Sequence, residues 1–139
     1  MRANIPGLVE SITNGIPTLA DGVRGGGNYV QQTQAYGVAP VIDVGKGTQA
    51  ILTVLDGVAF VVGVPLFNGA AMPANLNGME LLLVVRNTFG VMGVGTFNAI
   101  FKTAGAIPAI ANGFSRALLF VWNGTNWVES YRGAVDVAN

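Results

Sequence analysis

Two tryptophans near the end of the chain are the residues best suited to bind a ligand. They lie in the stretch FVWNGTNWVESYR, residues 120–132, where four residues separate Trp122 from Trp127. Stacked indole rings could form a ligand platform for a sugar, but the Asn-Gly pair between them is also a strong hairpin signal. A four-residue loop would set the two rings opposite each other, whereas a two-residue loop would set Trp122 opposite Thr125. We expect packing in the core or at an interface, since a cross-strand aromatic pair contributes roughly 0.2–1 kcal/mol, and keep the platform as the alternative.

The other residues that could do chemistry form no recognisable site. The chain has neither His nor Cys, which removes the commonest general base, the commonest metal ligand and the thiolate nucleophile. Asn123-Gly124-Thr125 satisfies the N-glycosylation pattern, but we expect a turn there. The carboxylates are isolated in sequence and single out no acid–base pair; they are Glu10, Asp21, Asp43, Asp56, Glu80, Glu129 and Asp136. We therefore expect no enzyme, no cofactor and no metal site.

Two glycine-rich stretches fail the tests for nucleotide binding. In DVGKGTQA, residues 43–50, Pro40 stands where a phosphate-binding loop needs Gly, and Gly47 follows Lys46 in place of Ser or Thr. In GVMGVGTFN, residues 90–98, the glycines lead into a β-like segment, whereas a dinucleotide fingerprint continues into a helix. We expect a turn in the first stretch and a bulge or tight sheet crossing in the second.

The composition predicts a protein whose surface lies against other protein. The 139 residues suit one domain, and only 10% are charged, against about 25% in average soluble domains. Seven basic and seven acidic residues leave no net charge and no basic patch, which argues against nucleic acid and membranes as partners. The longest uncharged stretch, residues 57–79, is broken by Pro and Asn and does not suit a membrane span. Because exposed apolar surface usually marks an interface, we expect the chain to associate with itself.

Residues 1–27 differ from the rest of the chain. They contain two Ile-Pro steps and end in Gly25-Gly26-Gly27. We expect an extended arm, with at most a marginal helix near residues 8–13, that docks on another protein surface. Its apolar residues would make that contact: Ile5, Leu8, Ile12, Ile16 and Leu19.

From residue 28 to residue 139 the pattern predicts a single β-domain. Runs of Val, Ile, Phe, Thr and Tyr are separated by Gly, Pro, Asn and Asp. We predict a hairpin at Asp56-Gly57 and turns at the Asn-Gly pairs that begin at residues 68, 77, 112 and 123. The spacing predicts an all-β fold, an antiparallel β-sandwich, jelly roll or small barrel. Its strands are expected near residues 29–35, 48–55, 58–64, 79–86, 90–93, 97–103, 116–122 and 126–132.

Two of these strands are apolar on both faces. MELLLVVRN holds five consecutive aliphatic residues at 81–85, and SRALLFVWN is apolar from residue 117 to residue 122. An antiparallel strand with one face in water should alternate between apolar and polar residues. Both faces should therefore be covered, and in so small a protein we expect another copy of the chain to supply the second cover.

The C-terminal half of the chain resembles the small β-domains of tailed-bacteriophage virion proteins. The likeness lies in the order of features in MELLLVVRNTFGVMGVGTFNAIFKTAGAIPAIANGFSRALLFVWNGTNWVES. A strand ends in a charged residue and a Gly turn, a β run leads into Phe101, the loop AGAIPAIANG follows, and an apolar strand ends in Trp-Asn-Gly-Thr-Asn-Trp. The ending RGAVDVAN also resembles their short tails, so the likeness covers roughly residues 48–139. Such domains occur in capsid decoration proteins, head fibres and tail-fibre tips.

The resemblance implies a compact β-domain, usually trimeric, attached to a virion, and it transfers no site residue. We expect a capsid decoration (cement) protein. It would be a homotrimer, made in the host cytoplasm, that binds the major capsid protein on the outside of the head and stabilises the shell. The arm would contact a capsid subunit or a neighbouring protomer. The alternative is a receptor- or glycan-binding tip of a tail fibre, which would use Trp122 and Trp127.

Overall fold

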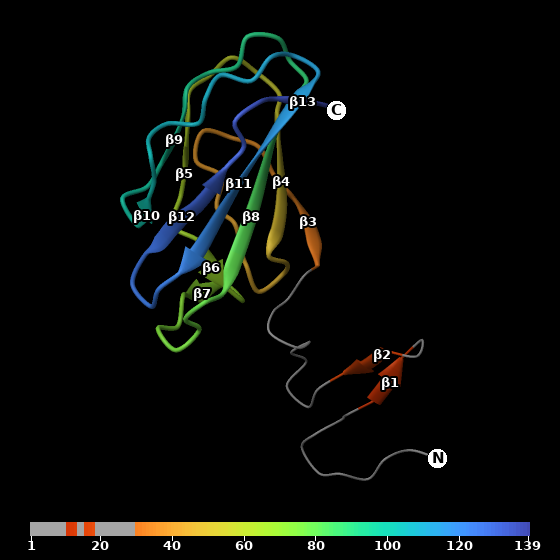
Figure 1. The fold of residues 1–139 in the computed structure, drawn as a ribbon, viewed down its shortest axis with the longest axis vertical. Coiled ribbons are helices and arrows are strands. Elements are labelled where there is room, and N and C mark those ends of the chain that lie inside the picture. Colours follow the sequence, from red (N-terminus) through yellow and green to blue (C-terminus); the bar gives the residue numbers. More distant parts are fainter. Residues whose placement is uncertain (1–10, 14–15, 19–29) are drawn as a thin grey trace.

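The chain is all-β in the part that its computed structural model describes, which is residues 11–13, 16–18 and 30–139. Every regular element in these ranges is a strand and none is a helix (Figure 1). The all-β prediction is therefore confirmed. The predicted boundary between arm and domain, and the arm residues Ile5, Leu8 and Leu19, lie outside the described residues.

A short hairpin lies within the predicted arm. Strand β1 (Ser11–Thr13) pairs antiparallel with β2 (Ile16–Thr18), and Ile12 is opposite Pro17. The marginal helix predicted near residues 8–13 is wrong for its described part, since Ser11–Thr13 is extended. Ile12 and Ile16, two of the residues expected to dock, belong to this hairpin.

A seven-stranded sheet covers one side of the domain (Figure 1). Its strands follow the order β10-β12-β11-β8-β4-β3, and β13 also pairs with β11. The sheet is mixed: β11 is antiparallel to β8, β12 and β13, whereas β3–β4, β4–β8 and β10–β12 are parallel pairs. The antiparallel arrangement expected from the sequence is therefore wrong for these three pairs. The strands are β3 (Gln31–Gln34), β4 (Gln49–Val54), β8 (Glu80–Asn87), β10 (Phe101–Lys102), β11 (Phe114–Trp122), β12 (Trp127–Arg132) and β13 (Val137–Ala138).

The other side of the core is covered by two small sheets and their loops. Strands β5 (Phe60–Val62) and β9 (Gly95–Phe97) form a parallel pair. Strands β6 (Leu66–Phe67) and β7 (Ala70–Ala71) form a hairpin on the crossover from β4 to β8. Its turn holds Asn68 at φ 51° and Gly69 at φ 80°, as a type I′ turn requires. The turn predicted from this Asn-Gly pair is confirmed.

The hairpin predicted at Asp56-Gly57 is wrong. Strand β4 pairs in parallel with β8, and β5 pairs in parallel with β9, so the two strands on either side of this turn lie in different sheets. Gly57 does not adopt the positive φ that a two-residue hairpin needs. The Asp56 carboxylate instead accepts hydrogen bonds from the Val58 amide at 2.9 Å and from the Tyr36 hydroxyl at 2.8 Å. These bonds hold a bend that sends the chain across to the second side of the core.

The glycine-rich stretch 90–98 is a close crossing between segments. The strand predicted at residues 90–93 is wrong: β9 begins later, at Gly95, and a turn at residues 98–100 separates it from β10. A Cβ at Gly93 would lie 2.3 Å from the Val58 carbonyl, and one at Gly95 would lie 2.5 Å from the Phe60 ring. Glycine is needed at residue 93 because two backbones approach each other, and at residue 95 because the Phe60 ring occupies the space; the tight crossing was one of the two alternatives predicted from the sequence.

The core lies between the seven-stranded sheet and the β5–β9 pair. Alternate residues of the central strands point into it, so that Leu81, Leu83 and Val85 of β8 are fully buried. Phe60 and Val62 of β5 enter it from the other side. Phe97, Phe101 and Phe120 form a cluster with ring centroids 5.0–5.4 Å apart. This packing leaves the opposite face of the sheet outside the core.

Candidate functional site

The two tryptophans belong to the core. Trp122 ends β11 and is directly opposite Trp127 at the start of β12, with their ring centroids 5.4 Å apart. The loop between them therefore has four residues, closed by the hydrogen bond from Asn123 N to Asn126 O at 3.0 Å. The Trp122 residue is 3% exposed and Trp127 is 0% exposed, and the Trp122 indole nitrogen donates to the Pro73 carbonyl. Neither ring offers a free face on which a sugar could stack.

The Asn-Gly pair between the tryptophans forms a turn. The Asn123 side-chain oxygen accepts hydrogen bonds from the backbone amides of Thr125 and Asn126, at 3.0 and 2.7 Å. Gly124 has φ 94°, a conformation that favours glycine. The turn predicted from this triplet is confirmed.

Asp43 joins two loops through its carboxylate. It accepts hydrogen bonds from the amides of Gly45, Asn68 and Gly69 at 2.8–3.0 Å, so it ties the loop after residue 42 to the β6–β7 turn. Burial acts to raise the pKa of Asp43, but these three amides and the charge of Lys46 outweigh it and lower the pKa below its ordinary value. The charge of Asp43 is thus used to hold the fold.

Two further carboxylates are also occupied by structural contacts. The burial of Tyr36, the hydrogen bond that its hydroxyl donates to Asp56 and the negative charge of Asp56 together raise the pKa of Tyr36 to about 12. Asp136 accepts from the Arg116 guanidinium at 2.7 Å and from the Ala111 amide, which fixes the C-terminal segment. Among the described residues no group of acidic side chains is placed to hold a metal ion. These carboxylates form no acid–base pair.

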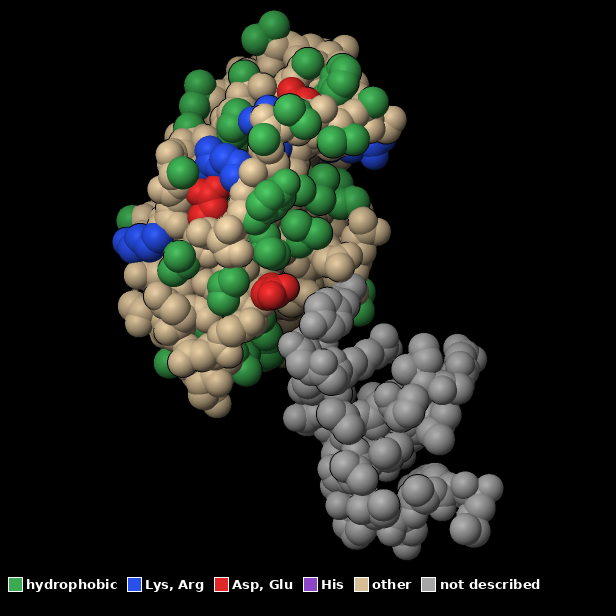
Figure 2. All heavy atoms as spheres, in the orientation of Figure 1, with side chains coloured by type: hydrophobic (Ala, Val, Ile, Leu, Met, Phe, Trp, Pro, Cys, Tyr) green, Lys and Arg blue, Asp and Glu red, His purple; other side chains and the backbone are tan. Residues whose placement is uncertain are grey.

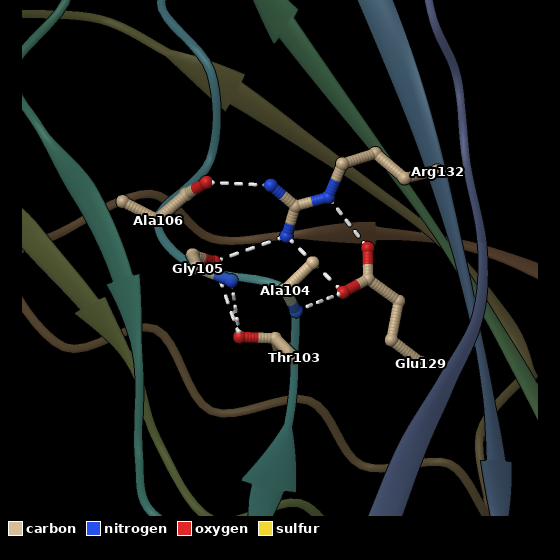
Figure 3. A network of polar contacts seen from close by, with 6 residues as sticks. All are labelled: Thr103, Ala104, Gly105, Ala106, Glu129 and Arg132. Atoms are coloured by element: carbon tan, nitrogen blue, oxygen red, sulfur yellow. Dashed lines mark hydrogen bonds and ion pairs between the residues drawn. The ribbon is translucent and has the colours of Figure 1, made fainter.

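A network of polar contacts closes one edge of the core (Figure 3). Arg132 donates to the Glu129 carboxylate at 2.5 and 3.3 Å, and to the carbonyls of Gly105 and Ala106 at 3.0 and 2.7 Å. Glu129 in turn accepts from the Ala104 amide at 2.6 Å. The side chains of Arg132 and Glu129 are only 20% and 8% exposed. The pair therefore fastens the loop at residues 103–106 to β12.

A β-bulge brings the two charges of this network to the same side. Residues three apart on a regular strand point to opposite faces. Here the register shifts between Leu119 and Phe120: Phe120 is opposite Glu129, whereas Leu119 is opposite Tyr131. The extra residue, Ser130, lets Glu129 and Arg132 both point inward, while Tyr131 points outward. Because no local sequence pattern marks this bulge, the network could not be predicted.

The face of the seven-stranded sheet opposite the core is apolar, and we call it the outer face. In register across the strands, Gln49, Leu82, Leu119 and Tyr131 form one row, and Ile51, Val84 and Ala117 form the next. Hydrophobic side chains gather over β4, β8 and β11 in Figure 2. Most of these residues are half-buried by their neighbours, and Tyr131 is 59% exposed. The apolar members are Ile51, Leu82, Val84, Ala117, Leu119, Val121, Val128 and Tyr131.

A second apolar surface lies at the end of the sheet where β4 and β8 finish and β11 begins. Val54 pairs with Asn87, and Asn87 with Phe114, so the residues that follow β4 and β8 lie beside the start of β11 and β13. Among residues 30–139, Val91 is the most exposed of the large hydrophobic residues, at 87%. We call this surface the apolar end; its exposed residues are Leu55, Phe89, Val91, Phe114, Val135 and Val137. Sequence reasoning missed it because its members come from four separate segments.

Comparisons with known proteins assign no family to this chain. No protein-family model matches it. No curated protein and no solved structure matches it either. Among the described residues no helix is long and apolar enough to cross a membrane.

Proposed function

We propose that this protein is a structural virion protein, a capsid decoration (cement) protein that assembles with itself and binds the outside of a phage head. The observation that carries the proposal is the presence of two separate apolar surfaces, the outer face and the apolar end, on a domain with little charge. A cement protein needs two kinds of contact, one with its own copies and one with the shell. The finer fold, a sandwich in which the β5–β9 pair faces the seven-stranded sheet, and self-association into a closed oligomer belong to this proposal.

The placement of the charged side chains supports a binding role over a catalytic one. Asp43, Asp56, Glu129 and Asp136 each accept hydrogen bonds that hold a loop, a bend or the C-terminal segment. The aromatic pair that could have held a sugar packs inside the core. What the surface offers to a partner is apolar area, and apolar area on this scale suits protein association.

In the proposed mechanism the protein acts mechanically. The apolar end contacts the major capsid protein, and copies joined through the outer face link adjacent capsid subunits. The arm, through Ile5, Leu8, Ile12, Ile16 and Leu19, adds a further contact with a capsid subunit or a neighbouring copy. No reaction takes place, and the shell is stabilised because separating its subunits would also expose these apolar contacts to water.

Cosedimentation with capsids tests this function. Capsids assembled from the major capsid protein of the same virus are mixed with the full-length protein and pelleted. Phe89→Lys and Val91→Lys place a charge in the apolar end, and we expect either to abolish cosedimentation without changing self-association. Val61→Lys is the matched control, since Val61 is an exposed valine of β5 outside both surfaces. Normal pelleting of both apolar-end variants would contradict the proposed contact, and failure of the unmodified protein to pellet would contradict the decoration role itself.

Deletion of residues 1–27 tests the arm separately. We expect the shortened protein to keep its folded β-domain, measured by its circular dichroism, and to lose capsid binding. Full binding by the shortened protein would show that the arm makes no essential contact.

A further inference from the structure

The charges of the outer face lie at the two ends of strand β8. Glu80 and Arg86 both point outward, because Leu81, Leu83 and Val85 point into the core. Six residues along a strand span about 20 Å. Neither side chain has an ion-pair partner among the residues that the structure describes. The other charge that the register places on this face is Lys102, at the edge strand β10, where it donates to the Ala99 carbonyl.

We propose that the outer face binds the same face of a second copy about a two-fold axis that runs across the strands. Each β8 then lies antiparallel over the β8 of the other copy. The proposal rests on the assembly function proposed above and specifies the geometry of its self-association.

The charges of β8 select this axis. A rotation about an axis across the strands reverses the strand direction, so Glu80 of each copy meets Arg86 of the other. An axis along the strands, or a three-fold arrangement of parallel strands, would instead bring Glu80 near Glu80 and Arg86 near Arg86. Like charges in contact oppose association. A two-fold interface is self-complementary by symmetry, so one favourable contact is made twice.

The side-chain sizes fit the same axis. Leu119 lies level with Leu82, and Ala117 lies level with Val84. With the axis between these two rows, Leu119 of one copy meets Ala117 of the other. Tyr131 is level with Leu119, and Gly133 is hydrogen-bonded to Ala117, so the large Tyr131 would meet a glycine. A large side chain thus faces a small residue at both places.

The extent of the face suits a reversible dimer. Five strands from β3 to β12 make the face about 24 Å wide and about 20 Å long, or about 500 Å² on each copy. The two copies together would bury about 1,000 Å² of surface, which is close to the lower limit for specific protein interfaces, about 1,200 Å². We therefore expect a dimer that dissociates on dilution.

Charge reversal tests this geometry on the full-length protein by sedimentation velocity over a dilution series. Glu80→Arg and Arg86→Glu should each weaken the dimer about tenfold, since each replaces two attractive contacts with two repulsive ones. The double variant Glu80→Arg/Arg86→Glu should restore the original dissociation constant. Both residues are exposed, so these variants are expected to fold. Equal weakening in the double variant and the single ones would overturn the proposal.

Leu82→Lys provides a second test, because it places a charge in the middle of the outer face. We expect it to give a monomer, whereas the control Val61→Lys should leave the dimer unchanged. A trimer of the unmodified protein would overturn the two-fold axis but leave a self-assembling decoration protein standing. A monomer at all concentrations would overturn this inference, and capsid binding by that monomer would still support decoration. A dimer that appears only after deletion of residues 1–27 would show that the arm, and not a second copy, covers the face, and would also overturn it.

Discussion

Replacing Arg132 with leucine removes the centre of the network that fastens the loop at residues 103–106 to β12. The variant loses both contacts with the Glu129 carboxylate and the two bonds to the loop carbonyls. Glu129 keeps only the bond from the Ala104 amide, although its side chain is 8% exposed. The carbonyls of Gly105 and Ala106 belong to exposed residues and can bind water instead. The main cost of Arg132→Leu is therefore a carboxylate left nearly buried without its cation.

The expected loss in the free energy of unfolding lies between the values for two kinds of ion pair. Exposed ion pairs contribute about 0.2–1 kcal/mol, and breaking a fully buried pair costs about 3–5 kcal/mol. Because Glu129 is nearly buried and Arg132 is one-fifth exposed, we expect Arg132→Leu to lower the free energy of unfolding by about 2–3 kcal/mol. For a domain of this size that loss lowers the melting temperature by about 10 °C.

Urea unfolding followed by tryptophan fluorescence measures this loss, since Trp122 and Trp127 are buried in the core. A double-mutant cycle compares the free energies of unfolding of Arg132→Leu, Glu129→Leu and the double variant. If the two side chains act on each other, the double variant should cost about 1–2 kcal/mol less than the sum of the single ones. Lys102→Leu, an exposed cation near the same loop, is the control and should change stability by less than about 0.5 kcal/mol. A loss under about 1 kcal/mol for Arg132→Leu, or strict additivity in the cycle, would refute the reasoning.

Three further predictions follow from individual residues. The pKa of Asp43 is lower in the folded protein than in the unfolded chain, so the ionised carboxylate stabilises the fold. This contribution to the free energy of unfolding is complete above the unfolded pKa of about 3.9 and is lost as the pH falls through the folded pKa. In urea unfolding at a series of acid pH values, Asp43→Asn should therefore lose less stability than the unmodified protein. The pKa of Tyr36 is raised to about 12 in the folded protein, so the protonated hydroxyl stabilises the fold. This contribution to the free energy of unfolding is complete below about pH 10 and is lost as the pH rises through the folded pKa. In the same assay at alkaline pH, Tyr36→Phe should not show this loss of stability. Gly93→Ala should destabilise by about 3 kcal/mol, because the new Cβ would meet backbone at 2.3 Å, whereas Gly37→Ala, with nothing within 4 Å, should be neutral in a thermal melt.

The strands and turns with strong local signals were predictable from the sequence. Strands β4, β8, β11 and β12 lie within two residues of their predicted bounds, because β-branched and aromatic runs there end at Gly, Asn or Asp. The four-residue loop between Trp122 and Trp127 was one of two alternatives that the sequence left open. The prediction of core or interface packing for this pair rested on the cross-strand pairing of two aromatic residues in a hairpin, and the structure places both rings in the core.

Pairing between distant strands was not predictable in the same way. Asp56-Gly57 has the composition of a hairpin turn, but the Asp56 carboxylate bonds to Tyr36, 20 residues earlier in the sequence, and the chain crosses over instead. The parallel pair β4–β8 follows from that crossover, and the parallel pair β3–β4 follows from the earlier connection at residues 35–48. The Glu129–Arg132 network depends on a bulge that only the register with β11 reveals. Each of these features is decided by tertiary contacts, which the local sequence propensities do not encode.

The edges of the sheet favour the proposed association through the outer face over strand addition. The edge strands β3 and β10 are four and two residues long, so either edge offers few backbone groups to a neighbouring strand. Gln32 of β3 is also held in place, because its side-chain amide donates to the carbonyls of Asp43 and Gly47. The outer face differs, since its neighbouring side chains already half-bury one another and lose little conformational freedom when a partner covers them. Strands β8 and β11 are apolar on both sides: one side forms the core, and the other would be covered by the second copy in the proposed dimer.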